Sequence, residues 1–319
     1  MASRETIARL IEKCGKENPC ALDARFNESM ANHSTFKTGG PADCWVKPSG
    51  DGFPAFAASL FAAARAESVP VFILGGGANI LVADAGIRGI VIDTGGWAGE
   101  VKRYDENTLE FRAGTSLDDA AEIAAGAGLS GLEFLAGMPG SIGGAVWMNA
   151  RCYGCEVAGV LTETEIFDFS GAQAERKRLP VNRSEFGYKR SPFQNRAVLI
   201  LSAAFQLNRK NAVQIRAEME KYRRDRVEKG HYRFPSAGSA FKNNKDFGKP
   251  TGKIIDELGL RGLQIGGAQV APWHGNLIIN TGNASSADIR ALVNEVSARV
   301  NRETGFILEP EILFAGQWE

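Results

Sequence analysis

Two glycine-rich stretches constrain the fold of this chain more than any other feature of its sequence. The first runs through Gly75-Gly76-Gly77 to Ala78-Asn79, between two apolar runs of β type. Glycine tolerates positive φ and has no Cβ, so successive backbone N–H groups can line a concavity that holds an anion. A dinucleotide-binding βαβ unit would need a long amphipathic helix beginning at the glycines. Apolar and turn residues follow instead, so the sequence predicts that these glycines join strand to strand.

The second glycine-rich stretch covers residues 131–149 and contains Gly137-Met138-Pro139-Gly140-Ser141-Ile142-Gly143-Gly144. Its Pro-Gly pair is typical of a tight turn, and its serine and paired glycines leave the backbone uncrowded. Such a surface suits a close approach to phosphate or to a flat ring. Two loops of this kind in one chain predict one long ligand, with its pyrophosphate on one loop and its ring system on the other.

Length and charge narrow the class of protein. A chain of 319 residues, 44% of them hydrophobic, has enough apolar surface for two domains. Its 37 basic and 37 acidic residues balance, which argues against sequence-independent binding of nucleic acid. The sequence has no apolar run long enough to span a bilayer, and residues 1–10 lack the apolar core of a signal peptide. We therefore expect a cytoplasmic protein without nucleic-acid or membrane partners. An oligomer is not predicted.

The five cysteines are scattered and odd in number, unlike a disulfide framework. Cys152 and Cys155 have Cys-x-x-Cys spacing, which leaves a redox pair as an alternative to two ordinary thiols. A structural zinc site would need two more ligands at matching spacing, and the three histidines form no such cluster. No metal is expected.

Hydrophobic periodicity predicts an α+β fold rather than regular βαβ alternation. Helices are expected at residues 4–14, 52–68, 117–127, 213–229, 254–260 and 286–302. Strands are expected on both sides of the first glycine stretch, at residues 90–93, 108–114 and 198–207, and as a hairpin over 160–169 and 176–181. Residues 15–33 read as an irregular connection. A last strand over 307–314 would place Glu309 and Glu311 on one face.

Five motifs in this order resemble the UDP-N-acetylenolpyruvoylglucosamine reductase family, over nearly the whole chain. They are Leu74-Gly-Gly-Gly-Ala-Asn79, Gly131-Leu-Glu with Met138-Pro-Gly-Ser-Ile-Gly-Gly144, Ser236-Ala-Gly-Ser-Ala-Phe-Lys-Asn243, Gly262-Leu-Gln-Ile-Gly-Gly267 and Leu308-Glu-Pro-Glu311. The resemblance implies a two-lobe FAD-binding fold of the vanillyl-alcohol-oxidase (PCMH) type, with lobes at 1–68 and 69–210. It implies an α+β substrate-binding domain at 211–319. The short passage after Leu207 is similar to the subclass without an extra tyrosine-bearing loop.

The same resemblance implies an enzyme of peptidoglycan precursor synthesis with FAD and NADPH as cofactors. NADPH would reduce FAD, and the reduced flavin would deliver hydride to the enolpyruvyl double bond of UDP-N-acetylglucosamine enolpyruvate. The implied cofactor-binding residues lie in the two glycine stretches: Gly75, Gly76, Gly77, Ala78, Asn79, Ile80, Gly137, Pro139, Gly140, Ser141, Gly143, Gly144 and Asn149. The implied substrate-binding residues are Tyr188, Lys242, Asn243, His274 and Asn276.

The implied catalytic residues are a proton donor, a carboxylate and a cation. Ser239 matches the family's proton donor, and Glu311 matches the carboxylate that polarises the substrate. The family pattern Tyr-Arg-x-Ser is replaced here by Tyr188-Lys-Arg-Ser191, so the cationic position carries Lys189 and an arginine, Arg190, follows. Lysine supplies charge without the bidentate fork of arginine. Neighbours in an extended strand face opposite ways, so Lys189 is favoured by alignment and Arg190 stays open.

Two smaller departures and two rival functions remain open. Ala78 replaces the usual serine of the first loop, and Arg151 stands where the family has glycine, either adding charge near the flavin or facing solvent. One rival is an oxidase of the same flavin fold that acts on an alcohol or a sugar. The other is a non-catalytic UDP-sugar-binding protein, motivated by Lys189.

Overall fold

The structure is a computed structural model that describes residues 2–171 and 173–318 and divides into two compact units. Unit 1 comprises Met1–Phe26, Asp43–Gly76 and Gly89–Arg224. Unit 2 comprises Asn27–Ala42, Gly77–Arg88 and Asp225–Glu319. The chain passes from one unit to the other within the first glycine stretch and within helix α5. The predicted three-part division at residues 68 and 210 stays a prediction.

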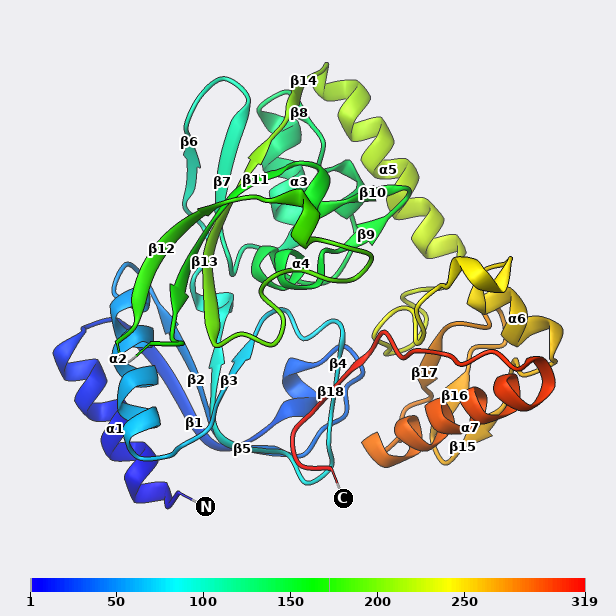
Figure 1. The fold of residues 1–319 in the computed structure, drawn as a ribbon, viewed down its shortest axis with the longest axis horizontal. Coiled ribbons are helices and arrows are strands. Elements are labelled where there is room, and N and C mark those ends of the chain that lie inside the picture. Colours follow the sequence, from blue (N-terminus) through cyan, green and yellow to red (C-terminus); the bar gives the residue numbers. More distant parts are fainter. Residues whose placement is uncertain (1, 172, 319) are drawn as a thin grey trace. The chain divides into compact units, whose positions relative to one another are not determined.

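The α-helices begin and end at recognisable sequence signals (Figure 1). Ser3, Ser116 and Ser141 each accept a hydrogen bond from a first-turn N–H of the helix that follows. Ser285 forms a full capping box with Asp288, and Gly305 ends the same helix at a φ of 73°. The helices are α1 (Arg4–Glu17), α2 (Phe53–Ala66), α3 (Leu117–Gly126), α4 (Ile142–Met148), α5 (Ala212–Glu228), α6 (Thr251–Glu257) and α7 (Ser286–Thr304).

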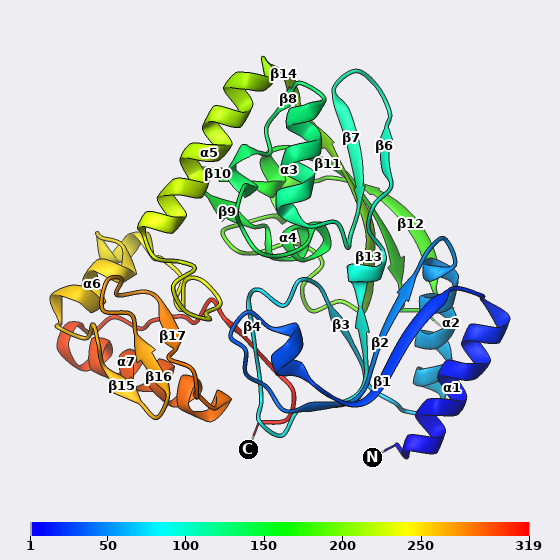
Figure 2. The ribbon, with the colours of Figure 1, turned by 180° about the vertical axis from the view of Figure 1, so that it is seen from behind.

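Unit 1 is built on two sheets. The first has strand order β1-β2-β5-β3, with β3 and β5 parallel. Helices α1 and α2 lie side by side next to it in both ribbon views (Figures 1 and 2). Its strands are β1 (Ala21–Ser29), β2 (Pro41–Ser49), β3 (Val71–Leu74) and β5 (Ile87–Asp93). The sequence does not predict β1, because its exposed and half-buried residues lack the apolar alternation that marks a strand.

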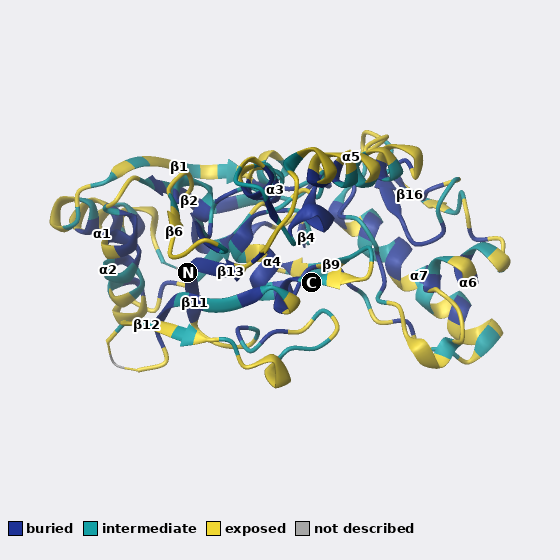
Figure 3. Cartoon of the chain, turned by 90° about the horizontal axis from the view of Figure 1, so that it is seen from above, coloured by how far each residue is buried: buried dark blue, intermediate teal, exposed yellow. Residues whose placement is uncertain are grey.

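The second sheet of unit 1 has the order β12-β11-β13-β7-β6. Its central strand β13 (Val198–Gln206) is buried along almost its whole length (Figure 3). Consecutive apolar residues are expected in a strand that is covered on both faces. The other strands are β6 (Val101–Arg103), β7 (Thr108–Arg112), β11 (Leu161–Asp168) and β12 (Glu175–Pro180). Strands β11 and β12 pair antiparallel, as the predicted hairpin requires.

Unit 2 contains a small antiparallel sheet of order β15-β16-β17 and one isolated parallel pair. The sheet strands are β15 (Gln264–Ile265), β16 (Ala268–Val270) and β17 (Ile278–Asn280). Helix α7 covers this sheet with an apolar stripe that includes Ile289, Leu292 and Val296. The parallel pair joins β4 (Ile80–Val82) to β18 (Leu313–Ala315). The first glycine stretch therefore does join strand to strand, as predicted.

The structure differs from the sequence-based expectation at the second glycine stretch and at the C-terminus. Residues 142–148 form helix α4 although two glycines lie in it, because Ser141 caps its start and Asn149 ends it in the left-handed region. The predicted last strand is shorter, and only Leu313–Ala315 pairs as β18. Within the described residues, no helix combines the length and the hydropathy that crossing a bilayer requires.

Candidate active site

The two glycine-rich stretches contact each other inside unit 1. A Cβ placed on Gly76 would lie 2.6 Å from the Cα of Gly140, and one on Gly75 would lie 2.8 Å from Oγ of Ser141. The Gly76 contact is with backbone, so glycine is required there, whereas a Cβ on Gly75 would force the Ser141 side chain to move. Gly137 and Gly140 also have positive φ, at 71° and 135°. The two stretches therefore lie close together in the part that belongs to this unit, whereas the predicted ligand across both of them stays a prediction.

The groups around the second stretch fit a cofactor with phosphates and a flat ring. Gly76, Pro139 and Gly144 are exposed, so the surface here is largely backbone. The N–H groups of Ile142 and Gly143 are not available, because they donate to the carbonyls of Thr115 and Ala113. The hydroxyl of Thr115, by contrast, is buried and has no hydrogen-bond partner among the described residues. An unsatisfied buried hydroxyl is unfavourable, and a ligand atom would relieve it.

Helix α4 connects this stretch to Asn149. Asn149 is fully buried at a φ of 46°, which asparagine tolerates better than most residues. Its Nδ2 donates to the carbonyl of Gly187 at 2.9 Å, and its Oδ1 accepts from the N–H of Ala158 at 3.0 Å. Both ends of the amide therefore have backbone partners. The assignment of Asn149 to the cofactor stays a prediction.

The predicted cations lie in a two-residue turn and not in an extended strand. Gly187 and Arg190 exchange two backbone hydrogen bonds of 3.0 Å, with Tyr188 and Lys189 between them. Lys189 has a φ of 56°, and its side chain is half-buried whereas Arg190 is exposed. A Cβ on Gly187 would lie 3.5 Å from Nε of Arg190, so the Arg190 side chain folds back over its own turn. The strand rule that opposed the two side chains therefore does not apply here.

Arg151, the departure from the family pattern, is exposed at the end of a short hairpin. Its guanidinium carbon lies 5.6 Å from the centroid of the Tyr188 ring. The hairpin pairs Cys152 directly with Cys155, across a turn in which Tyr153 and Gly154 have positive φ. All five cysteines are free thiols, and burial together with Glu218 raises the pKa of Cys155.

In unit 2, the rest of the first glycine stretch borders Glu311. Gly77 has a φ of 62°, and a Cβ there would lie 1.9 Å from the carbonyl oxygen of His33. Asn79 Nδ2 donates to the carbonyl of Glu311 at 2.9 Å, and the Asn79 carbonyl accepts from Leu313 at 3.0 Å. Asn79 therefore holds the chain at the buried Glu311 and two residues after it, directly before the strands β4 and β18 pair.

The segment that carries Ser239 pairs with the segment that carries Glu311. The Glu311 N–H donates to the carbonyl of Ala240 at 2.8 Å, and Phe241 forms a β-bridge with Pro310. On its other side, Ser239 forms a β-bridge with Leu277. Ser239 is half-buried, and no described residue is hydrogen-bonded to its hydroxyl. The structure thus brings the predicted proton donor and the predicted carboxylate onto neighbouring backbone segments.

The predicted substrate-binding side chains of unit 2 surround this pairing and already have protein partners. Lys242 forms an ion pair with Glu309. Oδ1 of Asn243 accepts from the N–H of Thr251 at 2.9 Å, in the first turn of α6. Asn276 is buried, and its amide makes two bonds, of 2.9 and 2.8 Å, with the backbone of Phe241. Asn276 therefore holds the segment that carries Ser239 in place through hydrogen bonds to its backbone.

His274 and His231 form a half-buried pair of rings with centroids 5.9 Å apart. Burial lowers the pKa of His231 to about 4 from 6.5, and Arg226 and His274 add to the shift. Burial also lowers the pKa of His274. Both rings are therefore neutral at pH 7. Nδ1 of His274 accepts from the N–H of Asn276 at 3.2 Å, so His274 can offer its Nε2–H, but not a charge, to a ligand.

These shifts predict that acid weakens the fold. A folded-state pKa below the unfolded value means that the unfolded chain binds more protons between about pH 6.5 and 4. The free energy of unfolding should therefore fall as the pH falls through that window, by at most about 1 kcal/mol per pH unit because the rings are partly solvated. Thermal unfolding from pH 7.5 to 4.5 measures the slope. His231→Gln should flatten it; equal slopes for the wild type and His231→Gln would refute the assignment.

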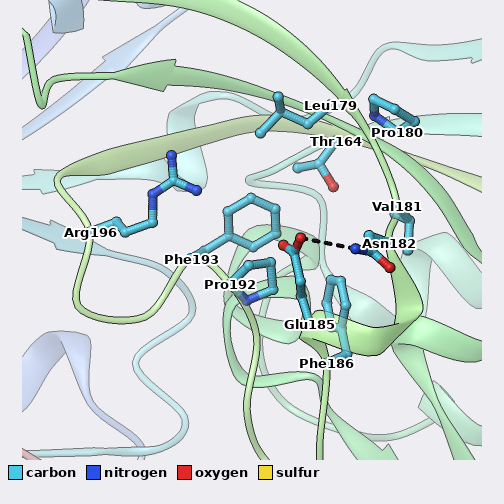
Figure 4. A pocket seen from close by; sticks show the side chains of 10 residues that line it. All are labelled: Thr164, Leu179, Pro180, Val181, Asn182, Glu185, Phe186, Pro192, Phe193 and Arg196. Carbon is cyan, nitrogen blue, oxygen red and sulfur yellow. Dashed lines mark hydrogen bonds between the residues drawn. The ribbon is translucent and has the colours of Figure 1, made fainter.

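A pocket in unit 1 contains none of the predicted site residues. It encloses about 310 Å³, counting its open mouth, between β11, β12 and the segment that follows them (Figure 4). Residues before and after the Gly187–Arg190 turn line one side of it. Its lining comprises Thr164, Leu179, Pro180, Val181, Asn182, Glu185, Phe186, Pro192, Phe193 and Arg196.

The predicted residues thus form two groups, one in each unit. Unit 1 holds the second glycine stretch, Gly75, Gly76, Asn149 and the Tyr188-Lys189-Arg190 turn. Unit 2 holds Gly77, Ala78, Asn79, Ile80, Ser239, Lys242, Asn243, His274, Asn276 and Glu311. Sequence motifs do not mark Thr115, because a lone threonine after a strand carries no signal. Metal ligation has no counterpart in the described parts of the chain, where no cluster of three His, Cys, Asp or Glu residues occurs.

Comparison with known proteins places the fold in a class of flavoproteins. Residues 57–173 match the family described as an FAD binding domain, which covers both glycine stretches. Residues 230–315 match the family described as the C-terminal domain of UDP-N-acetylenolpyruvoylglucosamine reductase, which covers Ser239 and Glu311. The predicted α+β flavin-binding fold with a C-terminal α+β domain is confirmed.

Relatives of known identity cover almost the whole chain. UDP-N-acetylenolpyruvoylglucosamine reductase of Borreliella burgdorferi is 41% identical over 91% of this chain and 93% of its own length. The enzyme of the same name from Treponema denticola is 41% identical over 92% of this chain and 94% of its own. The crystal structure of the reductase from Thermus caldophilus matches with a TM-score of 0.73 and 32% identity, over 92% of this chain and 99% of that one. The chain belongs to the UDP-N-acetylenolpyruvoylglucosamine reductase family and is a flavin oxidoreductase.

Proposed function

We propose that this protein reduces UDP-N-acetylglucosamine enolpyruvate to UDP-N-acetylmuramate, with NADPH as the electron donor, in the cytoplasmic synthesis of peptidoglycan precursors. The observation that carries the proposal is the pairing of the Ser239 segment with the Glu311 segment, in a chain that also has a glycine-lined surface for FAD. Family membership supports the substrate. That NADPH is the electron donor goes beyond family membership and is part of what we propose.

FAD would be held by the two glycine stretches. Gly75, Gly76, Gly140 and Ser141 form the part of this surface where two backbones come close, and Thr115 adds an unsatisfied hydroxyl. When bound, FAD supplies the hydride chemistry between the nicotinamide and the enolpyruvyl double bond. We propose residues 1–68 and 69–210 as the two flavin lobes and residues 211–319 as the substrate domain.

The chain's own residues would then donate one proton and stabilise one developing negative charge. Addition of hydride to one carbon of the double bond makes its neighbour carbanion-like, and a proton must reach that neighbour. The Ser239 hydroxyl is available to donate it, because the hydroxyl is not engaged by another described residue. Glu311 is buried beside the same backbone pairing, where a carboxyl group acts in a low dielectric.

Lys189 is proposed as the cation that faces the substrate carboxylate. Its half-buried position favours it over the exposed Arg190, whose side chain folds over Gly187. An ammonium ion in a partly dehydrated site attracts a carboxylate more strongly than one in water. Tyr188, Lys242, Asn243 and His274 are proposed to contact the rest of the nucleotide sugar.

The decisive test is a spectrum followed by two additions. The purified protein should show the absorbance of oxidised flavin, and anaerobic NADPH should bleach it. The enolpyruvyl nucleotide sugar should then restore the colour. Bleaching by a sugar or an alcohol, without bleaching by NADPH, would favour an oxidase instead. Binding of a UDP-sugar without consumption of NADPH would favour a non-catalytic binding protein.

A further inference from the structure

The turn that carries Lys189 is hydrogen-bonded to the C-terminal end of helix α4 through the residues on both of its sides. We call these two sides its arms: Gly187 belongs to the first arm, and Ser191 and Gln194 belong to the second. The first arm is held by Asn149, which follows α4 directly, and the second by the carbonyl of Trp147 in the last turn of the helix. From these contacts we infer that Asn149 is a positioning residue that sets the turn and its cation relative to the flavin-binding surface. The inference rests on the proposed function, because it assumes that a cation in this turn meets the substrate.

The side-chain amide of Asn149 joins the turn to a second backbone segment. Its donor holds the carbonyl of Gly187, the first residue of the turn, while its acceptor is occupied by Ala158. The side chain is fully buried. An amide with both ends bonded to backbone in the interior fixes the spacing of the segments it joins, since breaking either bond leaves an unsatisfied group. One amide hydrogen and one lone pair remain, but the complete burial of the side chain leaves little access for a ligand.

The second arm is held as firmly as the first. Oγ of Ser191 donates to the Trp147 carbonyl at 2.6 Å, and Nε2 of Gln194 donates to the same carbonyl at 3.2 Å. Gln194 Nε2 also reaches the carbonyl of Lys189 itself, at 3.1 Å. Behind the turn, Phe186 and Phe193 meet edge to face with ring centroids 6.3 Å apart (Figure 4). Each arm therefore has at least one hydrogen bond to the end of α4, and an aromatic contact joins the arms.

Helix α4 thereby sets a fixed distance between the second glycine stretch and the turn that carries Lys189. It begins at Ser141 in the second glycine stretch and ends at Asn149, so its seven residues span about 10 Å at about 1.5 Å per residue. Lysine is long and flexible, and the backbone of its turn sets the point from which the side chain extends. Loss of one fastening should therefore reduce the rate of the substrate step more than it reduces flavin binding.

The test variant is Asn149→Asp, which keeps the shape, the positive φ and the acceptor for Ala158. It replaces the donor to Gly187 by a carboxylate that repels the carbonyl. The matched control is Asn195→Asp, because Asn195 is exposed at a φ of 60° and has no side-chain bond to the turn. We expect Asn149→Asp to retain full FAD content and NADPH bleaching, and to slow reoxidation by the substrate about ten- to a hundredfold. Asn195→Asp should stay within about twofold of the wild type.

A double-mutant cycle shows whether the effect passes through the cation. In the Lys189→Ala background, which lacks the proposed cation, Asn149→Asp should slow reoxidation no further. Ser191→Ala, which loosens the other arm, should behave in the same way and provides a second variant if Asn149→Asp does not fold. Additive effects, or a loss of FAD from Asn149→Asp, would overturn the positioning role while leaving the proposed function intact. If neither Lys189→Ala nor Arg190→Ala affects reoxidation, the proposed cation role itself is wrong.

Discussion

Ser239→Ala should purify yellow, bleach with NADPH at the rate of the native protein, and then fail to regain its colour when the enolpyruvyl substrate is added. The expected loss in the reoxidation rate is about 10²- to 10⁴-fold, the usual contribution of a positioned proton donor. The reason is local. Ser239 forms a β-bridge with Leu277, so the alanine variant keeps the backbone and removes only the hydroxyl. Stopped-flow absorbance separates the two half-reactions.

The control for this prediction is the conservative variant Ser239→Cys. A thiol is a stronger acid than a hydroxyl, so it should restore part of the reoxidation rate if proton donation is what the alanine removed. Native reoxidation by Ser239→Ala would show that the proton comes from elsewhere. A colourless alanine variant would instead indicate a structural role for the segment.

The second large effect concerns the cation in the turn. Lys189→Ala should slow reoxidation by the substrate about ten- to a hundredfold, the loss expected for one hydrogen bond between charged groups, and should raise KM for the substrate. Arg190→Ala should have a small effect, because that side chain is exposed and folded over Gly187. Alanine keeps a Cβ at position 189, so the strain of the positive φ is unchanged and does not confuse the comparison.

Steady-state kinetics of both alanine variants and of Lys189→Arg would decide between the two cations. Lys189→Arg keeps the charge and should retain most of the rate. The opposite ranking, with Arg190→Ala impaired and Lys189→Ala native, would assign the role to Arg190.

Much of the fold follows from local sequence signals. The capping box at Ser285 and Asp288, the glycine at position 305 and the apolar stripe of α7 predict that helix from neighbouring residues alone. The strand β13 follows from its apolar run in the same way. By contrast, β1 lacks an apolar pattern and pairs as a strand only because β2 lies beside it in the sheet.

In the candidate site, too, some residues are predictable from local sequence and others only from the tertiary structure. The motifs around Gly76, Ser239 and Glu311 identify residues whose chemistry is carried by their own side chains or by the absence of one. The hydrogen-bond partners of Asn149 and Asn276, and the lack of one for the Thr115 hydroxyl among the described residues, are not visible in any motif, because each depends on which distant backbone group lies within hydrogen-bonding distance. The Lys189 turn is a similar case, since a two-residue turn and an extended strand are compatible with the same four residues.

The sequence by itself therefore determined the family and the flavin-binding α+β class, and it predicts the reactive groups, since glycine, serine and glutamate each bring their chemistry wherever they fold. Only the tertiary structure decided that Ser239 and Glu311 sit on paired segments, and that Asn149 holds the turn of Lys189. The physical reason is that hydrogen bonds between segments far apart in the chain form only after the backbone has folded, and no local pattern encodes their partners.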